Sequence, residues 1–290
     1  MDYNSQYLNY LNKFDTELNK ALGFLKDIPP LLKESMTYAI IDGGKRIRPV
    51  LCFATADMLG IDLEEVNEFA VAVECIHSYS LVHDDLPAMD NDDFRRGKFS
   101  THKKFGEAYG ILAGDALLNF AFEYPLNKTN FNACDAEAMK ILAECAGSKG
   151  MIAGQVLDLQ NEKNSDVSEK ILYDIYLNKT AKLLIAPLLI ASVFANKKYF
   201  SELKNFGYHL GIMFQISDDI MDVEGSVESI GKTPNKDAQV DKLTSIKVFG
   251  LNGAKDRLNH HYLECLKILG KINANSFLEE FTKKMYVRKK

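Results

Sequence analysis

The sequence predicts an all-α protein, and three observations support that prediction. Apolar residues recur at steps of three and four along most of the 290 residues, which is the spacing of one helix face. No segment alternates apolar and polar residues over the length of a strand. No stretch rich in glycine, serine or proline divides the chain, so residues 1–290 are expected to form a single domain.

Helix boundaries follow from capping signals and prolines. The first helix is expected to end near Pro29, and Pro49 can open the third because a first helical residue needs no N–H. Asp62 and Asp166 are each followed three residues later by glutamate, the acidic form of a helix N-terminal signature. The expected segments are 8–25, a run ending at 43–44, a run from 49, 62–82, 106–124, 133–160, 166–184, 199–222, 240–251, 254–270 and 274–288.

Composition narrows the classes of function. Hydrophobic residues make up 47% of the chain, which is enough for a sizeable core and excludes global disorder. The net charge of −5 argues against a nucleic-acid partner, which usually requires a basic face. The five cysteines are widely spread without a Cys-x-x-Cys pair, so reduced thiols are expected, with neither disulfides nor a zinc site.

No membrane insertion is expected. The N-terminal residues have no basic start followed by an apolar run, as a signal peptide would. The longest apolar stretch, residues 183–195, is 13 residues long and contains Pro187. A membrane-spanning helix needs about 20 residues, so this stretch is expected to be a buried helix of a cytoplasmic protein.

A dense group of carboxylates follows the apolar helix that ends near residue 82. Five aspartates fall within ten residues, namely Asp84, Asp85, Asp90, Asp92 and Asp93. Carboxylates this close repel one another unless cations intervene, and a few hard oxygen ligands suit Mg²⁺ that also binds a substrate phosphate. A solvated acidic loop is the alternative. A calcium EF-hand is excluded because Arg95 would stand at its glycine position.

A second group of polar residues lies on one face of a later helix. Gln215, Asp218, Asp219 and Asp222 are spaced i, i+3, i+4, i+7, among apolar neighbours. Burying such a stripe without partners would be costly. A solvent-facing stripe is possible for this helix alone, but two such groups in one all-α chain favour a site.

Cations alternate with the aspartates along the sequence. They are Lys45, Arg46 and Arg48 before a helix start, Arg95 and Arg96 after the first cluster, Lys179 upstream of Pro187, and Lys232 and Lys242 after the second cluster. Helix starts favour anions through free amides and the helix dipole. Each pair alone could be a solvated surface; together with the aspartates they fit a magnesium-bound diphosphate carried by an apolar tail.

These residues resemble the all-trans isoprenyl diphosphate synthases, and among them the bacterial farnesyl diphosphate synthases. The resemblance runs from about residue 39 to residue 253 and includes several motifs in the same order. They are Gly43-Gly44-Lys45-Arg46-Ile47-Arg48-Pro49, residues 77–90, Arg95-Arg96-Gly97, Gly154-Gln155-x-x-Asp158, Lys179-Thr180, Gln215-x-x-Asp218-Asp219-x-x-Asp222 and Gly231-Lys232. The resemblance implies a bundle of ten or more helices around a central active-site cavity, and a homodimer.

The resemblance also implies roles for the motif residues. Asp84, Asp90 and Asp218 would ligate three Mg²⁺ ions, and Asp85, Asp219 and Asp222 would orient those ligands or bind through water. The allylic diphosphate would be held by Arg95, Lys179, Lys232 and Lys242, and isopentenyl diphosphate by Lys45, Arg48, His77 and Arg96. Gln155 and Asp158 would support the site. Relatives often continue Lys-x-Thr-Tyr-Pro where this chain has Lys242-Leu243-Thr244-Ser245-Ile246, which leaves the role of Lys242 open.

The implied reaction condenses isopentenyl diphosphate with dimethylallyl diphosphate and then geranyl diphosphate, giving farnesyl diphosphate. Magnesium and the cations would stabilise the departing diphosphate as the allylic carbon–oxygen bond ionises. The carbonyl of Lys179, with Thr180 and Gln215, would face the allylic cation, and the released diphosphate would remove the proton. An apolar pocket would exclude water from the cation.

Product length is expected to depend on the helix before Asp84. Tyr79 lies five residues earlier, about 7–8 Å deeper at 1.5 Å per residue. In the family an aromatic residue here accompanies a farnesyl product, whereas Ser80 is small and shares the face of Asp84. Helix geometry alone also allows Tyr79 to be an ordinary core residue, because it is rotated away from that face.

Other functions compete with this interpretation. A class I terpene cyclase needs Ser/Thr and then Glu where this chain has Asp222 and Ser226, and a helical phosphohydrolase needs a metal-binding histidine upstream of His77. A non-catalytic prenyltransferase-like binding subunit would be expected to lack the aspartates. The principal alternative is therefore a geranylgeranyl diphosphate synthase with the same mechanism.

Overall fold

The computed structural model describes residues 2–41, 43–162, 168–224 and 242–287 and is almost entirely helical. The chain forms two compact units, residues 2–139 and residues 140–290. The prediction of an all-α fold with ten or more helices is confirmed. The expectation of one domain with a central cavity stays a prediction.

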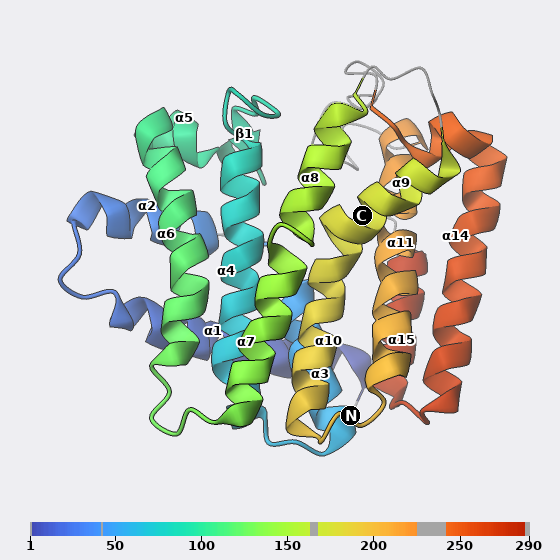
Figure 1. The fold of residues 1–290 in the computed structure, drawn as a ribbon, viewed down its shortest axis with the longest axis horizontal. Helices are drawn as coiled ribbons and strands as arrows, with labels where there is room; N and C mark the ends of the chain where they lie inside the picture. Colours follow the sequence, from blue (N-terminus) through green and yellow to red (C-terminus); the bar gives the residue numbers. More distant parts are fainter. Residues whose placement is uncertain (1, 42, 163–167, 225–241, 288–290) are drawn as a thin grey trace. The chain divides into compact units, whose positions relative to one another are not determined.

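The first unit contains a set of helices and one small hairpin (Figure 1). Its elements are α1 (Tyr3–Phe24), α2 (Pro30–Ile41), α3 (Ile47–Leu59), the 3₁₀ turn η1 (Leu63–Val66), α4 (Asn67–Asp84), β1 (Phe94–Arg95), β2 (Lys98–Phe99), α5 (Thr101–Phe105), α6 (Glu107–Leu126) and the start of α7 (Ala133–Ala146). Helix α4 is the core of this unit because most of its side chains are buried. The first aspartate cluster therefore begins at the end of a rigid, buried helix.

Helix α6 lies along α4 and fixes its C-terminal end (Figure 1). A β-carbon on Gly114 would come within 2.1 Å of His83 Nε2, so only glycine leaves room for this ring. His83 Nε2 in turn hydrogen-bonds with the carbonyl oxygen of Ile111 at 3.1 Å. His83 precedes Asp84, and this contact holds the first aspartate of the cluster in place.

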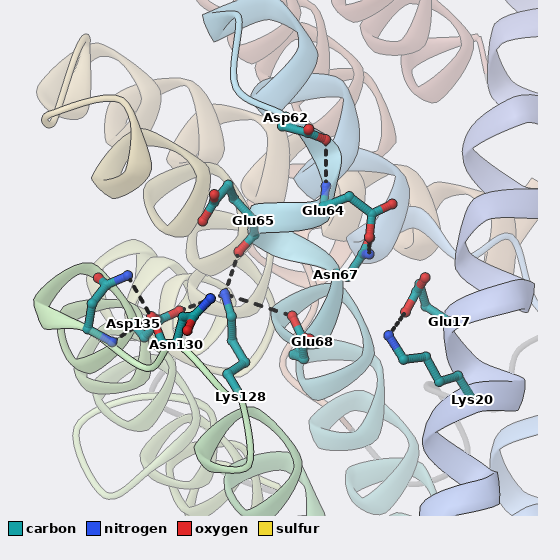
Figure 2. Close-up of polar contacts among 11 residues, drawn as sticks. Glu17, Lys20, Asp62, Glu64, Glu65, Asn67, Glu68, Lys128, Asn130 and Asp135 are labelled. Atoms are coloured by element: carbon teal, nitrogen blue, oxygen red, sulfur yellow. Dashed lines mark hydrogen bonds and ion pairs between the residues drawn. The ribbon is translucent and has the colours of Figure 1, made fainter.

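A buried ion pair joins the end of α6 to the start of α7 (Figure 2). Lys128 Nζ lies 2.8 Å from Asp135 Oδ1 and donates to the carbonyl oxygen of Glu65 at 3.1 Å. The Asp135 side chain is fully buried, and its Oδ2 accepts from the backbone N–H of Asn132. These contacts hold the chain beside η1 and α4, at the other end of α4 from the aspartates.

The second unit contains one helix, α10 (Lys182–Phe194), that is almost completely buried. Its elements are α8 (Met151–Gln160), α9 (Glu169–Ile175), the π-helical turn η2 (Tyr176–Ala181), α10 (Lys182–Phe194), α11 (Phe200–Glu224), α14 (Ser245–Lys271) and α15 (Ser276–Tyr286). Helix α11 packs against both α10 and α14. The helical stretch Glu169–Phe194 is long and apolar enough to cross a membrane, judged by length and composition alone. However, 72% of its most apolar part is buried inside the protein. The predicted buried helix is thus confirmed.

Several boundaries differ from the sequence prediction. Helix α3 begins at Ile47, so Pro49 lies in its first turn rather than at its first position. The segment predicted at 133–160 breaks at residues 147–150, where a β-carbon on Gly150 would come within 2.0 Å of the Cys145 carbonyl oxygen. A two-residue hairpin, β1 and β2, occupies part of the loop expected at 84–105. Asp62 caps η1, whereas Asp166 lies outside the described residues.

Candidate active site

The Gly43-Gly44 segment enters α3 through left-handed backbone conformations. The φ angles of Gly43, Gly44 and Arg46 are +81°, +98° and +46°. Such angles suit glycine but strain a residue with a side chain. Arg46 is held in this conformation by its contacts: it donates to Glu74 at 2.9 Å and to the carbonyl oxygens of Ile40 and Ile41 at 2.6 and 2.9 Å.

The structure separates the three cations of this segment. Arg46 is buried and paired with Glu74, so it holds the loop in place. Lys45 is exposed, and Arg48 is half-buried. Arg48 Nε has no hydrogen-bond partner among the residues that the structure describes, and burial lowers the pKa of Arg48 to about 10. A buried donor of this kind is suited to an anionic ligand.

The hairpin places two arginines in different environments. Arg95 Nε donates to both carboxylate oxygens of Asp85, at 2.9 and 2.7 Å, and Arg95 Nη2 donates to Oδ1 at 2.5 Å. Arg96 stands in the turn at a φ of +53° and donates from Nη1 to the carbonyl oxygen of Gly43 at 2.7 Å. Arg96 therefore links the hairpin to the glycine loop.

A cavity of about 450 Å³ opens between these two segments. Its lining includes Gly43, Gly44, Asp85, Arg95 and Arg96, together with Lys98 from β2. Lys98 pairs with Arg95 in the hairpin register. The sequence analysis did not identify Lys98, although it follows the Arg95-Arg96-Gly97 motif directly.

His77 lies about two helix turns before Asp84 on α4 and is surrounded by positive charge. Burial lowers its pKa well below the ordinary 6.5, and Arg48, Arg96, Arg95 and Arg46 lower it further. The imidazole is therefore neutral at pH 7. A neutral ring among these arginines can donate one hydrogen bond to an anion.

The first aspartate cluster folds back on itself. The backbone N–H of Asp90 donates to the carbonyl oxygen of Asp84 at 2.8 Å, and the backbone N–H of Asp92 donates to the carbonyl oxygen of Asp85 at 3.1 Å. Asp84 is half-buried, Asp90 is exposed, and Asp85 is buried against Arg95. The backbone thus brings Asp84 and Asp90 close together, while the Asp85 side chain accepts hydrogen bonds from Arg95.

Tyr79 is 5% exposed and lies on the buried side of α4. Its ring stands edge-on to His83, with 5.8 Å between ring centroids, and its hydroxyl has no hydrogen-bond partner within the described part of the chain. Burial and the charge of Asp84 raise the pKa of Tyr79 to about 12. Ser80 is half-buried and donates to the His77 carbonyl oxygen at 2.8 Å.

In the second unit, Asp158 gathers two of the predicted lysines. Lys179 Nζ lies 2.5 Å and Lys242 Nζ lies 3.4 Å from Asp158 Oδ2. Burial of Asp158 opposes ionisation, but the two lysines more than offset it and lower the pKa of Asp158. Gln155 is half-buried one turn earlier on α8. Lys232 lies outside the described residues.

Lys179 and Thr180 occupy the π-helical turn η2, and close backbone contacts hold this turn on two sides. A β-carbon on Gly154 would come within 2.1 Å of the Lys179 nitrogen, and one on Gly211 within 2.3 Å of Ala181 Cβ. Helices α8 and α11 therefore approach the turn only because both residues are glycine. Single π turns inside α-helices are frequent at functional sites.

The aspartates of α11 divide into two environments. Asp218 and Asp222 are half-buried, and they lie on one face of the helix. Asp219 is buried, and that burial raises its pKa to about 6 although four hydrogen bonds oppose the shift. Gln215 Oε1 accepts from Thr180 Oγ1 at 2.9 Å, and its Nε2 donates to Asp219 at 3.3 Å.

The described residues contain no group of three or more His, Cys, Asp or Glu side chains that could hold a metal ion alone. Mg²⁺ differs from such protein-enclosed ions, because it is commonly bound by one or two carboxylates with water and substrate phosphates completing the octahedron. The pairs Asp84–Asp90 and Asp218–Asp222 fit that type of binding.

Comparison with known proteins identifies the family. The Polyprenyl synthetase family matches residues 29–278. The chain belongs to the polyprenyl synthetase family. A member of this family from Micrococcus luteus, named farnesyl diphosphate synthase, is 44% identical over 279 residues, covering 94% of this chain and 93% of the relative.

Two further polyprenyl synthetase relatives bear on product and ligand. A chloroplastic geranylgeranyl pyrophosphate synthase from Catharanthus roseus is 42% identical over 82% of this chain and 69% of its own length. A crystal structure of a geranyltransferase from Helicobacter pylori, complexed with magnesium and isoprenyl diphosphate, has a TM-score of 0.79 and 32% identity, covering 96% of each chain.

Proposed function

We propose that this chain is a prenyltransferase that condenses isopentenyl diphosphate with dimethylallyl diphosphate and then geranyl diphosphate, head to tail. The products are (2E,6E)-farnesyl diphosphate and diphosphate. One observation carries the proposal: in each unit, carboxylates suited to magnesium occur beside cations that a buried aspartate orders, Asp85 with Arg95 and Asp158 with Lys179. The name of the Micrococcus luteus relative supports the farnesyl product.

Magnesium is the proposed cofactor, with three ions per active site. Asp84, Asp90 and Asp218 would ligate it, and Asp85, Asp219 and Asp222 would orient these ligands or bind through water. Bound magnesium neutralises the charge that develops on a departing diphosphate. The magnesium and isoprenyl diphosphate named for the Helicobacter pylori structure support this cofactor and the substrate class.

Two sets of cations would bind the two substrates. Arg95, Lys179, Lys232 and Lys242 would hold the allylic diphosphate, and Lys45, Arg48, His77 and Arg96 would hold isopentenyl diphosphate. The Nε of Arg48, which has no hydrogen-bond partner among the described residues, and the neutral ring of His77 support the second assignment, because both can donate to an anion. Arg95 presents a planar fork that Asp85 already orients, which lowers the entropy lost on binding.

The chemical step places demands on the chain's own groups. The allylic carbon–oxygen bond breaks, the double bond of isopentenyl diphosphate attacks the allylic cation, and the released diphosphate accepts the proton. The carbonyl of Lys179, Thr180 Oγ1 and Gln215 Oε1 would direct negative dipole toward that cation. The Thr180–Gln215 hydrogen bond of 2.9 Å fixes the orientation of the last two groups before substrate binds.

Tyr79 is the proposed limit to chain growth, with Ser80 beside it. Its buried ring on α4 supports a farnesyl product. The Catharanthus roseus relative supports a second candidate, a geranylgeranyl product made by the same mechanism. A homodimer in the cytoplasm, built from a single polyprenyl synthetase domain, completes the proposal.

The proposal is tested with Asp84→Asn and Asp218→Asn, compared with Asp93→Asn. Asp93 is exposed and paired with Lys103 at 3.0 Å, so its variant matches the chemical change at the edge of the same cluster. Both site variants are expected to lose at least about a hundredfold in prenyl product formation, while Asp93→Asn stays near wild type. Equal rates in all three variants would contradict the proposal.

A further inference from the structure

Tyr176 is a buried tyrosine at the start of η2, three residues before Lys179. Its hydroxyl donates to Asp219 Oδ2 on α11 and accepts from the backbone N–H of Ser245 at 2.8 Å. Ser245 is the first residue of α14. One phenol group therefore joins the η2 turn, helix α11 and the start of α14.

Asp219 is fully engaged by these neighbours. Its Oδ2 accepts from the backbone N–H and the Oγ of Ser245, at 2.7 and 2.8 Å, as well as from Tyr176. Its Oδ1 accepts from Gln215 Nε2 at 3.3 Å. A carboxylate that is only 3% exposed needs such donors, and three of the four go to Oδ2.

A second hydrogen bond joins η2 to α11, in addition to the Tyr176–Asp219 hydrogen bond. Thr180 of η2 donates to Gln215 of α11, four residues from the Tyr176–Asp219 contact on both elements. The hydrogen bond between Gln215 and Asp219 joins these two contacts into one network. Lys179 lies between Tyr176 and Thr180 along the chain, and its backbone nitrogen lies close to Gly154.

The network also reaches Lys242. Ser245 is three residues after Lys242, and both Lys242 and Lys179 contact Asp158. A shift of η2 against α11 would move Lys179 relative to Asp218, and loss of the Ser245–Asp219 contact would release the segment that carries Lys242. Ser245 donates to this carboxylate from both its backbone N–H and its Oγ.

We propose that Tyr176, Ser245 and Asp219 form a latch that positions Lys179 and Lys242 for the allylic diphosphate. Tyr176 and Ser245 are positioning residues, and Asp219 acts through the latch rather than as a direct magnesium ligand. This inference rests on the proposed function, which assigns those lysines to the diphosphate.

The test compares Tyr176→Phe with Tyr173→Phe in the full chain. Tyr173 lies on the same helical stretch, and its hydroxyl contacts His261 at 3.3 Å instead of the latch, so each variant loses one hydroxyl. Calorimetry measures the affinity for inorganic diphosphate with Mg²⁺, and steady-state assays measure KM for dimethylallyl and isopentenyl diphosphates. Tyr176→Phe is expected to weaken diphosphate binding and raise the allylic KM by roughly tenfold or more, while its isopentenyl KM stays unchanged. Tyr173→Phe is expected to keep the wild-type diphosphate affinity and both wild-type KM values.

Ser245→Ala and Ser245→Thr provide a second, independent pair. The alanine variant is expected to raise the allylic KM, and the threonine variant, which keeps the hydroxyl, is expected to restore it. Equal effects of Tyr176→Phe and Tyr173→Phe, or a fall in kcat with no change in diphosphate affinity, would overturn the latch. A wild-type chain that binds diphosphate but forms no prenyl product would overturn the proposed function alone, because the latch is judged on binding. A wild-type chain that does not bind diphosphate would overturn both.

Discussion

The guanidinium of Arg96 lies directly against the backbone of Gly44. A β-carbon on Gly44 would come within 2.7 Å of Arg96 Nη2, and the φ angle of Gly44 is +98°. The backbone conformation favours glycine here, and a β-carbon would require the Arg96 guanidinium to move. The Gly43-Gly44 motif and the Arg95-Arg96 motif therefore contact each other through Arg96.

Gly44→Ala is expected to displace Arg96 and raise KM for isopentenyl diphosphate by about tenfold, which corresponds to about 1.4 kcal/mol. Gly60→Ala is the matched control, because Gly60 has a φ of +76° but no atom within 4 Å of its β-carbon position. The control is expected to lose stability through backbone strain while KM stays unchanged. Steady-state kinetics with both variants checks this, and an equal change in KM would contradict it.

Tyr79→Ala is expected to lengthen the product beyond farnesyl diphosphate, because removing the buried ring opens space below the first aspartate cluster. Tyr79→Phe keeps the ring and removes only a hydroxyl that has no hydrogen-bond partner in the described residues. That variant is expected to keep the wild-type product. Chromatography of the dephosphorylated alcohols distinguishes the two, and the same product from both variants would show that Tyr79 does not limit chain growth.

Lys128→Met is expected to lower the free energy of unfolding by about 3–5 kcal/mol, because the fully buried Asp135 loses its cation. The double variant Lys128→Met/Asp135→Leu removes both charges and is expected to recover part of that loss. Lys267→Met breaks an exposed pair with Glu264 and is expected to cost less than about 1 kcal/mol. Urea unfolding of the three proteins tests this, and similar stabilities would contradict the structural role of Lys128.

Stability is expected to fall in acid because of His261. Burial, together with the charges of His209, His260 and Arg257, lowers the pKa of His261 to about 3 from 6.5, whereas Glu264 acts in the opposite direction. The unfolded chain therefore takes up a proton below pH 6.5 that the folded chain does not, so stability present above pH 6.5 is lost as the pH falls. At pH 5 this loss amounts to about 2 kcal/mol.

His261→Asn is expected to reduce that acid sensitivity. Urea unfolding at pH 7.5 and pH 5 measures the difference, with the exposed His260→Asn as the control. The result expected is a smaller loss in His261→Asn than in wild type and in the control. An identical loss in all three proteins would show that another group is responsible.

The sequence was sufficient for the fold class, because helix periodicity is a local property, whereas the roles of the motif residues stay predictions. The sequence could not show that Arg46 is buried in an ion pair whereas Arg48 is not, since Arg46 pairs with Glu74, 28 residues away. Tyr176 was missed for the same reason: its partners Asp219 and Ser245 are 43 and 69 residues distant. A tyrosine within an apolar helical run carries no local signal of such a partner.

Boundaries were less predictable than helices. The missing N–H of proline is tolerated anywhere in the first turn, so Pro49 did not fix the start of α3 at a single residue. The break at residues 147–150 depends on Gly150 approaching the backbone of Cys145. Close approach of this kind is decided by packing and has no distinct pattern in the sequence.

The most direct measurement mixes the purified protein with isopentenyl and dimethylallyl diphosphates, with magnesium or with EDTA, and chromatographs the dephosphorylated alcohols. The account predicts farnesol with magnesium and no prenyl alcohol with EDTA. Geranylgeraniol would keep the mechanism and remove Tyr79 as the limit to chain growth. No prenyl alcohol under either condition, from folded protein, would contradict the central claim that this chain is a prenyltransferase.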